Sequence, residues 1–261
     1  MKIIKQILYR VFGLNTYLLL LQKGFKIGYQ TGFLKRNPEY KWHYFIKNLV
    51  KKEDTIIDIG ANLGYFSFIF GNIIDNTGAL YCVEPVEPFR NILKKILPAQ
   101  KNIYILPFAL GDKDEANITM GMPAWLEGLG YLRHGTVSVL NENDISQNKF
   151  VFTATIRKAD DVFKDFKKID YIKCDIEGYE RIVIPCLKKI LVKHQPLVQL
   201  ETWGEQLPQM LSFFDEIGFS PYHLNNNRLV ACQQMNFDEI ADSDILFVHK
   251  NKTERIAKFM K

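Results

Sequence analysis

A short apolar strand that leads through an acid into a glycine turn constrains this chain more than any other stretch. Thr55 to Ile59 is apolar apart from Asp58 and suits a strand buried on both faces of a parallel sheet. The turn from Gly60 to Gly64 follows, and an apolar helical stretch begins at Tyr65. Glycine lacks a Cβ, so the turn can take unusual dihedral angles and let a ligand lie close to its backbone. This order predicts a parallel α/β fold that presents backbone N–H groups and a helix N-terminus to a ligand.

The spacing of the two glycines separates this turn from a dinucleotide site. A nicotinamide or flavin fingerprint has the order G-x-G-x-x-G, whereas here three residues, with Asn62 in the middle, separate Gly60 from Gly64. No diphosphate has to be cradled, so a third glycine is not needed. The form resembles motif I of class I S-adenosylmethionine (SAM) methyltransferases. From this turn alone, a buried strand with a tight turn and no ligand is the alternative.

Strands and helices alternate along the remainder of the chain, which forces parallel pairing and a three-layer fold. We expect further strands at residues 79–83, 103–106, 168–174, 197–200 and 244–249, with helices at 65–74, 89–97, 181–191 and 206–217. A hairpin is expected around residues 225–227, so the last strand would run antiparallel to the others. Residues 109–112 are predicted to form a loop, and residues 117–152 are the least regular part.

Acids stand at the ends of five predicted strands: Asp58, Glu84, Asp112, Asp175 and Glu201. Ligands of such sheets bind outside the carboxyl ends of the strands, so we expect these acids to lie along one edge. A random distribution of acids would not give this pattern.

Two of these acids, Glu84 and Asp112, suit a nucleoside. The Glu84 carboxylate offers only acceptors and can bind both ribose hydroxyls, although a solvated residue before a turn is the alternative. Asp112 and the backbone of Ala109 and Leu110 are predicted to lie where main-chain groups would read an adenine. We expect Asp58 to hold the glycine turn and the amino end of a methionine rather than to take part in chemistry.

Four stretches resemble the FkbM family of SAM-dependent methyltransferases: residues 58–67, 83–85, 109–112 and 169–180. The resemblance covers roughly residues 50–250, and its most specific part is Ile169-Asp-Tyr-Ile-Lys-Cys-Asp-Ile-Glu-Gly-Tyr-Glu180. The chain departs from the family's Thr-Leu-Asp-Asp-like turn at Thr155-Ile-Arg-Lys-Ala-Asp-Asp161, which has extra residues and two cations.

The resemblance implies a three-layer, Rossmann-like class I methyltransferase sheet, SAM as methyl donor and S-adenosylhomocysteine as product. It also implies O-methylation of a hydroxyl, often on a sugar of a glycan, a glycolipid or a glycosylated natural product. The cofactor-binding residues that it implies are Asp58, Gly60, Asn62, Gly64, Tyr65, Phe66, Glu84, Pro85, Ala109, Leu110, Asp112 and Asp175.

Methyl transfer to a sugar needs a base, because a sugar hydroxyl does not ionise near neutrality. Asp175 and Glu177 emerge together from the fourth strand, and Glu201 follows the fifth. Glu177, Glu201 and His134 are each candidates for the base, and Asp175 is predicted to orient the sulfonium side of SAM or the acceptor. A divalent metal held by Asp175, Glu177 and Glu201 is the less favoured alternative.

Four residues are predicted to contact the acceptor: Trp125, His134, Glu177 and Trp203. Flat apolar rings suit the C–H faces of sugars, although core packing explains a tryptophan equally well. Trp203 follows Glu201 at the active edge and is the better candidate. Glu180 is more simply a residue of a first helical turn, where the dipole favours an acid.

Composition divides the chain into segments. Residues 1–50 are predicted to be a basic helical extension, because residues 1–53 hold eleven Lys and Arg against two Glu. Residues 51–251 are the predicted SAM-binding domain, with 113–155 as an acceptor-binding insertion, and 252–261 are a basic tail. The first helix either packs on the domain with a solvated basic face or rests on anionic lipid.

Charge and cysteine usage bear on partners and location. A net charge of +5 is mild and does not call for nucleic acid. Four scattered cysteines without a C-x-x-C pair indicate free thiols, so we expect a cytoplasmic protein, or one at the inner face of a membrane. The sequence does not constrain the oligomeric state.

Three other functions compete with sugar O-methylation. A nicotinamide-dependent oxidoreductase shares the acid at Glu84 but is disfavoured by the glycine pattern. A non-catalytic SAM-fold binding module is disfavoured because the strand-end acids occur together. Methylation of a hydroxyl on a small molecule other than a sugar remains as an alternative.

Overall fold

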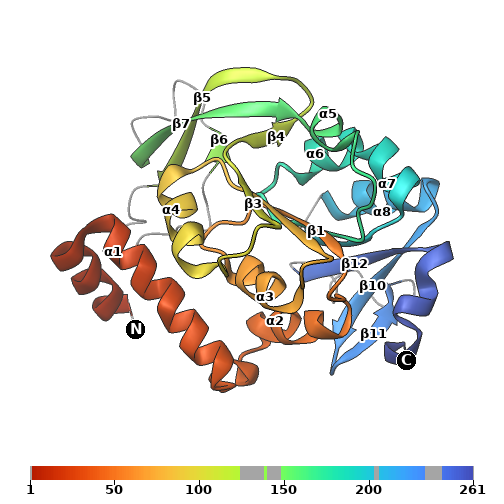
Figure 1. Ribbon diagram of the computed structural model, residues 1–261, viewed down its shortest axis with the longest axis horizontal. Coiled ribbons are helices and arrows are strands. Elements are labelled where there is room, and N and C mark those ends of the chain that lie inside the picture. Colours follow the sequence, from red (N-terminus) through yellow and green to blue (C-terminus); the bar gives the residue numbers. More distant parts are fainter. Residues whose placement is uncertain (1, 124–137, 140–147, 203–205, 233–242, 261) are drawn as a thin grey trace.

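The fold is that of a computed structural model, which describes residues 2–123, 138–139, 148–202, 206–232 and 243–260 (Figure 1). An eight-stranded sheet runs through it. Its order is β11 (Arg228–Ala231), β10 (Phe219–Asn225), β12 (Ser243–His249), β9 (Leu197–Thr202), β8 (Tyr171–Cys174), β1 (Thr55–Ile59), β2 (Ala79–Val83) and β3 (Ile103–Leu106).

Strand direction divides the sheet into two parts. The strands from β3 through β2, β1 and β8 to β9 are parallel. Strands β12, β10 and β11 each run antiparallel to their neighbours. This confirms the predicted Rossmann-like α/β fold, with a mostly parallel sheet and antiparallel pairing near the C-terminus.

Helices cover both faces of the sheet (Figure 1). One face packs against α1 (Lys2–Gln30), α2 (Lys41–Phe45), α3 (Tyr65–Ile73) and α4 (Glu87–Ile96). The other packs against α5 (Ala159–Phe163), α6 (Glu180–Cys186), α7 (Lys188–His194) and α8 (Gln206–Glu216). Because side chains alternate along a strand, Ile56 joins the first core and Ile57 the second.

The N-terminal extension is helical, as predicted, and forms part of the core in its described side chains. Helix α1 breaks at Gly13, whose φ is 71°. Tyr17 and Leu18 are fully buried against the α4 side, and the rings of Phe25 and Tyr65 stack with centroids 4.3 Å apart. Phe25 and the buried residues of α2 therefore belong to the main core rather than to a separate appendage.

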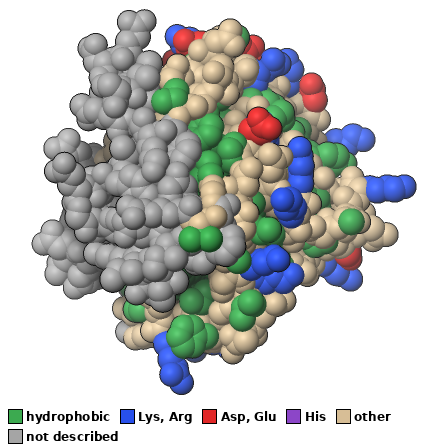
Figure 2. Space-filling view, turned by 90° about the vertical axis from the view of Figure 1, so that its left-hand side faces the viewer, with side chains coloured by type: hydrophobic (Ala, Val, Ile, Leu, Met, Phe, Trp, Pro, Cys, Tyr) green, Lys and Arg blue, Asp and Glu red, His purple; other side chains and the backbone are tan. Residues whose placement is uncertain are grey.

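The outer side of this region is partly apolar. Val11, Leu20 and Ile27 of α1 are exposed, as is Phe33 of the short 3-10 helix η1 (Phe33–Arg36). Lys and Arg side chains are spread among apolar ones over the described part of the face shown in Figure 2. None of the helices in the described part combines the length and apolar character that crossing a membrane requires.

A second, four-stranded sheet contains most of the residues expected to form a loop, 109–112, and the described parts of the region expected to be irregular, 117–152. Its order is β4 (Ala109–Gly111), β7 (Asn148–Lys158), β5 (Glu115–Pro123) and β6 (Ser138–Val139). The prediction of a loop at 109–112 was wrong, because β4 pairs with β7, a strand far along the chain from it. Much of the predicted acceptor-binding insertion, 113–155, forms the antiparallel pair of β5 and β7. Tertiary pairing of this kind overrides weak local strand signals.

The described residues of the predicted basic tail, 252–261, pack back onto the domain. In the 3-10 helix η6 (Lys250–Arg255), Arg255 Nη2 donates to Asp54 Oδ2 at 2.6 Å and to the Leu49 carbonyl at 2.7 Å. Asp54 is only 2% exposed, and the following Ile256 is fully buried. A buried carboxylate needs a partner, and Arg255 supplies it.

Gly60 offers a test of the packing at the first strand. Its φ is +78°, and a Cβ there would lie 1.9 Å from the Asp175 carbonyl oxygen. We expect Gly60→Ala to lower the free energy of unfolding by about 2 to 4 kcal/mol, because it combines backbone strain with a clash. The measurement is urea unfolding.

Gly24→Ala is the matched control, since a Cβ at Gly24 meets nothing within 4 Å inside helix α1. It should raise the free energy of unfolding by about 0.5 to 1 kcal/mol. Wild-type stability in Gly60→Ala would show that the glycine turn is not constrained as described.

Candidate active site

A cavity of about 690 Å³ lies at the carboxyl ends of β1, β2 and β8. This is the edge at which ligands bind in open α/β sheets. The predicted site residues among those that line it are Asp58, Gly60, Asn62, Tyr65, Phe66, Glu84, Pro85, Ala109, Leu110, Asp175 and Glu177. The sequence motifs therefore predicted much of the wall of this cavity.

Glu84 is fixed at the end of β2 by backbone donors. Its carboxylate accepts N–H groups from Asn62 and Val86, each at 2.7 Å. Asn62 reaches this position with a positive φ of 49°. Burial raises the pKa of Glu84 to about 7, although the two N–H donors act in the opposite direction. Each carboxylate oxygen has further acceptor capacity, which suits the predicted contact to a ribose diol.

The two glycines of the turn are required by the packing of the protein itself. Gly60 lies against the Asp175 carbonyl, as described above. A Cβ at Gly64 would lie 2.6 Å from Leu93 and 2.8 Å from Ile96, and its φ is +77°. Gly64 is not among the cavity-lining residues. The glycines therefore set the path of the turn even without a close ligand.

Asp58 holds the first turn of α3 from the end of β1. Its Oδ2 accepts a short hydrogen bond from the Ser67 hydroxyl. Oδ1 has no hydrogen-bond partner among the described residues, although Asp58 is 1% exposed and lines the cavity. Burial raises the pKa of this carboxyl. An acceptor left open in a buried site suits a cationic ligand group.

Lys173 places a buried positive charge beside these acids. Its Nζ lies 2.9 Å from Asp175 Oδ2, and its side chain is 3% exposed. Burial acts to lower the pKa of Lys173, but Asp175, Asp58 and Asp244 outweigh burial and raise it. The ammonium group also lies 4.7 Å from the centroid of the Phe66 ring. Lys173 is therefore charged and compensates several carboxylates at once.

Asp175, Glu177 and Glu201 form a carboxylate cluster. One oxygen from each lies within 4.8 Å of the others. Burial and the neighbouring Asp175 charge raise the pKa of Glu201 to about 9. Burial acts to raise the pKa of Asp175, but Lys173 and a hydrogen bond from Glu201 outweigh it and lower that pKa. Near neutral pH, Asp175 is therefore ionised and Glu201 carries a proton.

The turn after β8 aims Glu177 at the cavity. Glu177 has a φ of 55° and Gly178 a φ of 96°. The buried Glu180 carboxylate accepts the N–H groups of Ile176, at 2.6 Å, and Gly178, at 2.8 Å. Glu180 therefore stabilises the turn from the start of α6, and Glu177 lines the cavity.

A sequence model described as the Methyltransferase FkbM domain matches residues 58–221, which is more than half of the chain. The chain belongs to the FkbM methyltransferase family. It is a SAM-dependent methyltransferase. No curated protein sequence matched the chain.

Several solved structures are similar to this FkbM methyltransferase in fold. The FkbM methyltransferase of Methylobacillus flagellatus KT matches with a TM-score of 0.46 and 12% identity over 76% of this chain and 44% of that one. The chain thus spans less than half the length of that relative. Fibrillarin of Aeropyrum pernix, with natively bound SAM, gives 0.44 and 10% over 79% and 72%. A SAM-dependent O-methyltransferase of Thermotoga maritima gives 0.43 and 13% over 81% and 65%.

The cavity residues of this FkbM methyltransferase fit SAM. Glu84 offers acceptors for a ribose diol, and Asp58 Oδ1 is an unpaired acceptor for an ammonium group among the described residues. A volume of about 690 Å³ lies within the usual range for small-molecule sites. When bound, SAM supplies a methyl group activated by its positively charged sulfur.

Some predicted site residues lie elsewhere. Asp112 is exposed and does not line the cavity, so the geometry does not favour its predicted role beside an adenine. Glu201 belongs to the carboxylate cluster but is not a lining residue. Trp125, His134 and Trp203 lie outside the described residues, so their predicted contacts with the acceptor stay predictions.

Lys173 and His43 are among the lining residues that the sequence analysis did not name. Lys173 interrupts an apolar strand within the motif that resembles the family, and this charge was the available signal. His43 gave no signal, because it comes from α2 in the N-terminal extension. Its ring stacks on Phe66 with centroids 4.0 Å apart, and it lines the cavity. Burial and the nearby Lys173 lower the pKa of His43 to about 3, so it is neutral.

The carboxylate cluster also has the composition of a divalent-metal site, the less favoured alternative. Lys173 argues against that use, because its ammonium group already pairs with Asp175 at 2.9 Å. The proton held by Glu201 removes a second negative charge from the cluster. A divalent ion would have to displace the Lys173 ammonium group from Asp175 and the proton from Glu201.

The raised pKa of Glu201 predicts a pH dependence of stability. In the unfolded chain Glu201 loses its proton near its ordinary pKa of 4.5, but in the folded protein only near 9. Between these values the folded state binds more protons, so raising the pH lowers the free energy of unfolding. Glu84, with a pKa of about 7, acts in the same direction over the lower part of this range.

We therefore expect the melting temperature of the ligand-free protein to fall from pH 5 to pH 9, and Glu201→Gln to make this fall shallower. Exposed Glu254→Gln is the control and should leave the slope unchanged. Parallel slopes in wild type and Glu201→Gln would contradict the proton assigned to Glu201.

Proposed function

We propose that this methyltransferase transfers the methyl group of SAM to a hydroxyl of a sugar in a glycan, a glycolipid or a glycosylated natural product. The observation that carries this proposal is the cluster of Asp175, Glu177 and Glu201 beside the cofactor-type cavity. The sugar is supported by the resemblance to the FkbM family, which commonly methylates sugar hydroxyls. A hydroxyl on another small molecule is the alternative.

O-methylation asks two things of the protein. The acceptor oxygen must be held in line with the methyl carbon, because positioning supplies much of the rate. The oxygen then bonds to that carbon as the carbon–sulfur bond breaks, and the hydroxyl proton passes to a base. A carboxylate of the cluster is suited to accept this proton, and Lys173 stabilises the local charge.

Glu177 is the described carboxylate best suited to be the base. Glu201 holds a proton near neutral pH, because its pKa is raised to about 9. Asp175 is engaged with Lys173 at 2.9 Å and is suited to orientation. Glu177 lines the cavity and lies close to both. Glu201 then acts as a hydrogen-bond donor that keeps Asp175 in place.

Two isosteric substitutions separate these roles. Glu177→Gln should lower kcat by about 10²- to 10⁴-fold, the usual contribution of a general base. Glu201→Gln should retain most of the activity, because glutamine resembles the protonated carboxyl that it replaces. Methyl transfer is measured by incubating each protein with labelled SAM and total glycan and lipid fractions. Calorimetry checks that both variants still bind SAM.

The reverse ranking, with Glu201→Gln inactive and Glu177→Gln active, would make Glu201 the base. Label found only in acceptors without sugars would remove the carbohydrate proposal. A wild-type protein that does not bind SAM would remove the proposed function altogether.

We also propose that the protein works in the cytoplasm at the inner face of a membrane, where a lipid-linked glycan would be presented. Support comes from the exposed side chains of Val11, Ile27 and Phe33, which are 66%, 62% and 72% exposed. They occur in an N-terminal region with eleven basic residues against two acids in residues 1–53. Apolar contact and attraction to anionic lipid together suit peripheral binding.

Replacing the exposed apolar residues tests the membrane contact. Ile27→Ser with Phe33→Ser should reduce flotation with vesicles that contain phosphatidylglycerol. Val151→Ser with Val192→Ser is the control, since these two side chains are also exposed, at 45% and 49%, but lie outside the N-terminal region. Equal flotation of both double variants and the wild type would exclude this contact.

A further inference from the structure

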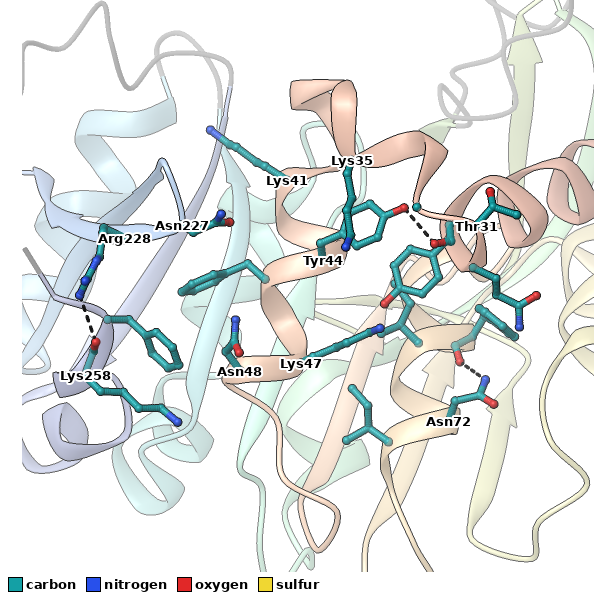
Figure 3. Close-up of a pocket in the computed structure, with 18 residues that line it drawn as sticks. Thr31, Lys35, Lys41, Tyr44, Lys47, Asn48, Asn72, Asn227, Arg228 and Lys258 are labelled. Carbon is teal, nitrogen blue, oxygen red and sulfur yellow. Dashed lines mark hydrogen bonds between the residues drawn. The ribbon is translucent and has the colours of Figure 1, made fainter.

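A second cavity, of about 1250 Å³, lies beside the active site and has no role in the chemistry above. It is bordered by the end of α1, by η1, α2 and α3, by the turn between β10 and β11, and by the C-terminal segment (Figure 3). The two cavities share none of their described lining residues. Helix α2 stands between them: His43 lines the active-site cavity, whereas Tyr44 and Phe45 line the second one.

The lining of the second cavity carries charge of one sign. Among the described residues, five cations line it and no Asp or Glu does: Lys35, Lys41, Lys47, Arg228 and Lys258. In the same part of the chain, none of the five lies within 4.0 Å of a carboxylate oxygen as an ion pair. Gathering like charges without counter-charges is unfavourable, so the cavity favours an anionic ligand.

Aromatic rings hold three of the ammonium groups. Lys35 Nζ lies 5.5 Å from the centroid of the Tyr44 ring, and Lys47 Nζ lies 4.8 Å from that of Tyr29. Lys258 Nζ lies 4.8 Å from the Phe259 ring. A ring face attracts a cation but takes few of its N–H donors, so the donors remain available. In Figure 3, Lys35 and Lys47 extend toward the middle of the cavity from different sides.

Neutral polar groups complete the lining. Thr31, Asn48, Asn72 and Asn227 border the cavity and can donate or accept hydrogen bonds. The hydroxyl of Tyr29 has no hydrogen-bond partner among the described residues. Cations, amides and aromatic faces together suit a ligand with several phosphate groups and an attached apolar or planar part.

We propose that this cavity is a binding site for a ligand with two or more phosphate groups, such as a phosphate-rich small molecule or the diphosphate headgroup of a lipid. The phosphates would lie on Lys35, Lys47, Lys258 and Arg228, with the attached group on the aromatic rings. The cations surround a cavity instead of forming a track across the surface, so a compact phosphate ester suits it better than a nucleic acid. The proposal does not depend on methyl transfer.

Tripolyphosphate is the probe, and its affinity is measured by calorimetry at low salt. The triple substitution of Lys35, Lys47 and Lys258 by Gln should weaken binding by about tenfold or more, since each exposed charge contributes modestly. The matched control replaces Lys94, Lys101 and Lys189, three lysines outside the cavity lining, and removes the same charge. It should change the affinity less than about twofold, because salt screens distant charges.

Vesicles distinguish the two sources of the phosphates. Binding of free tripolyphosphate without binding to phosphatidylcholine vesicles that contain diacylglycerol diphosphate indicates a soluble ligand. Binding to those vesicles, lost in the cavity triple variant and kept in the control, indicates a lipid headgroup. Either result supports the site.

Three results would overturn the proposal. The wild type and both triple variants could bind tripolyphosphate with equal affinity, or both triple variants could lose the same affinity. The protein could also bind single-stranded RNA that tripolyphosphate does not displace. Melting curves establish that the variants are folded. Should the triple variant fail to fold, Lys47→Glu against Lys94→Glu makes the same comparison with one reversed charge in each protein. No readout uses methyl transfer, so failure here is distinct from failure of the proposed function.

Discussion

The edge of the sheet that carries the active site depends on one buried lysine, whose positive charge is compensated by carboxylates from three strands. Lys173 lies opposite Asp58 in the ladder between β8 and β1, near the middle of the eight-stranded sheet. Asp175 follows on the same strand, and Asp244 contributes from β12. An uncompensated charge at this depth would cost several kcal/mol, and removing one partner of such a pair commonly costs about 3 to 5 kcal/mol. The charges are therefore a condition of the fold as well as part of the site.

Neighbouring polar groups keep this arrangement rigid. The Tyr171 hydroxyl donates to Gln199 Oε1 at 2.8 Å, and Gln199 Nε2 donates to Asp244 Oδ2 at 2.9 Å. This chain of hydrogen bonds links β8, β9 and β12, and it holds Asp244 directly opposite Glu201 in the ladder. A satisfied polar network in the interior specifies one arrangement of its members. The proton on Glu201 is thus a consequence of burial and of the acids Asp175 and Asp244 that the sheet holds close to it.

The main sheet was well predicted from the sequence, because its strands are short apolar runs between helical stretches. Prediction failed where pairing joins distant segments, as between β4 and β7. The same pairing explains Asp112: the chain after β4 follows the second sheet, so this acid does not line the cavity although its position in the sequence suggested it. The role of Lys173 at the site could have been predicted, because it is a charge inside an apolar strand. His43 was not, because nothing local indicates that α2 lies against the active-site cavity.

Lys41 lines the basic cavity and also interacts with a charged residue near the active site, Asp244. Its Nζ contacts His223 Nε2 at 3.3 Å. Burial lowers the pKa of Lys41, and the nearby Asp244 acts in the opposite direction. Part of the Lys41 charge is therefore balanced by the acids of the active edge.

The attraction of the basic cavity for an anion arises mainly from its other four cations. None of them has such an acid near it among the described ion pairs: Lys35, Lys47, Arg228 and Lys258. Helix α2 thus carries a lining residue of each cavity, His43 of the active-site cavity and Lys41 of the basic cavity.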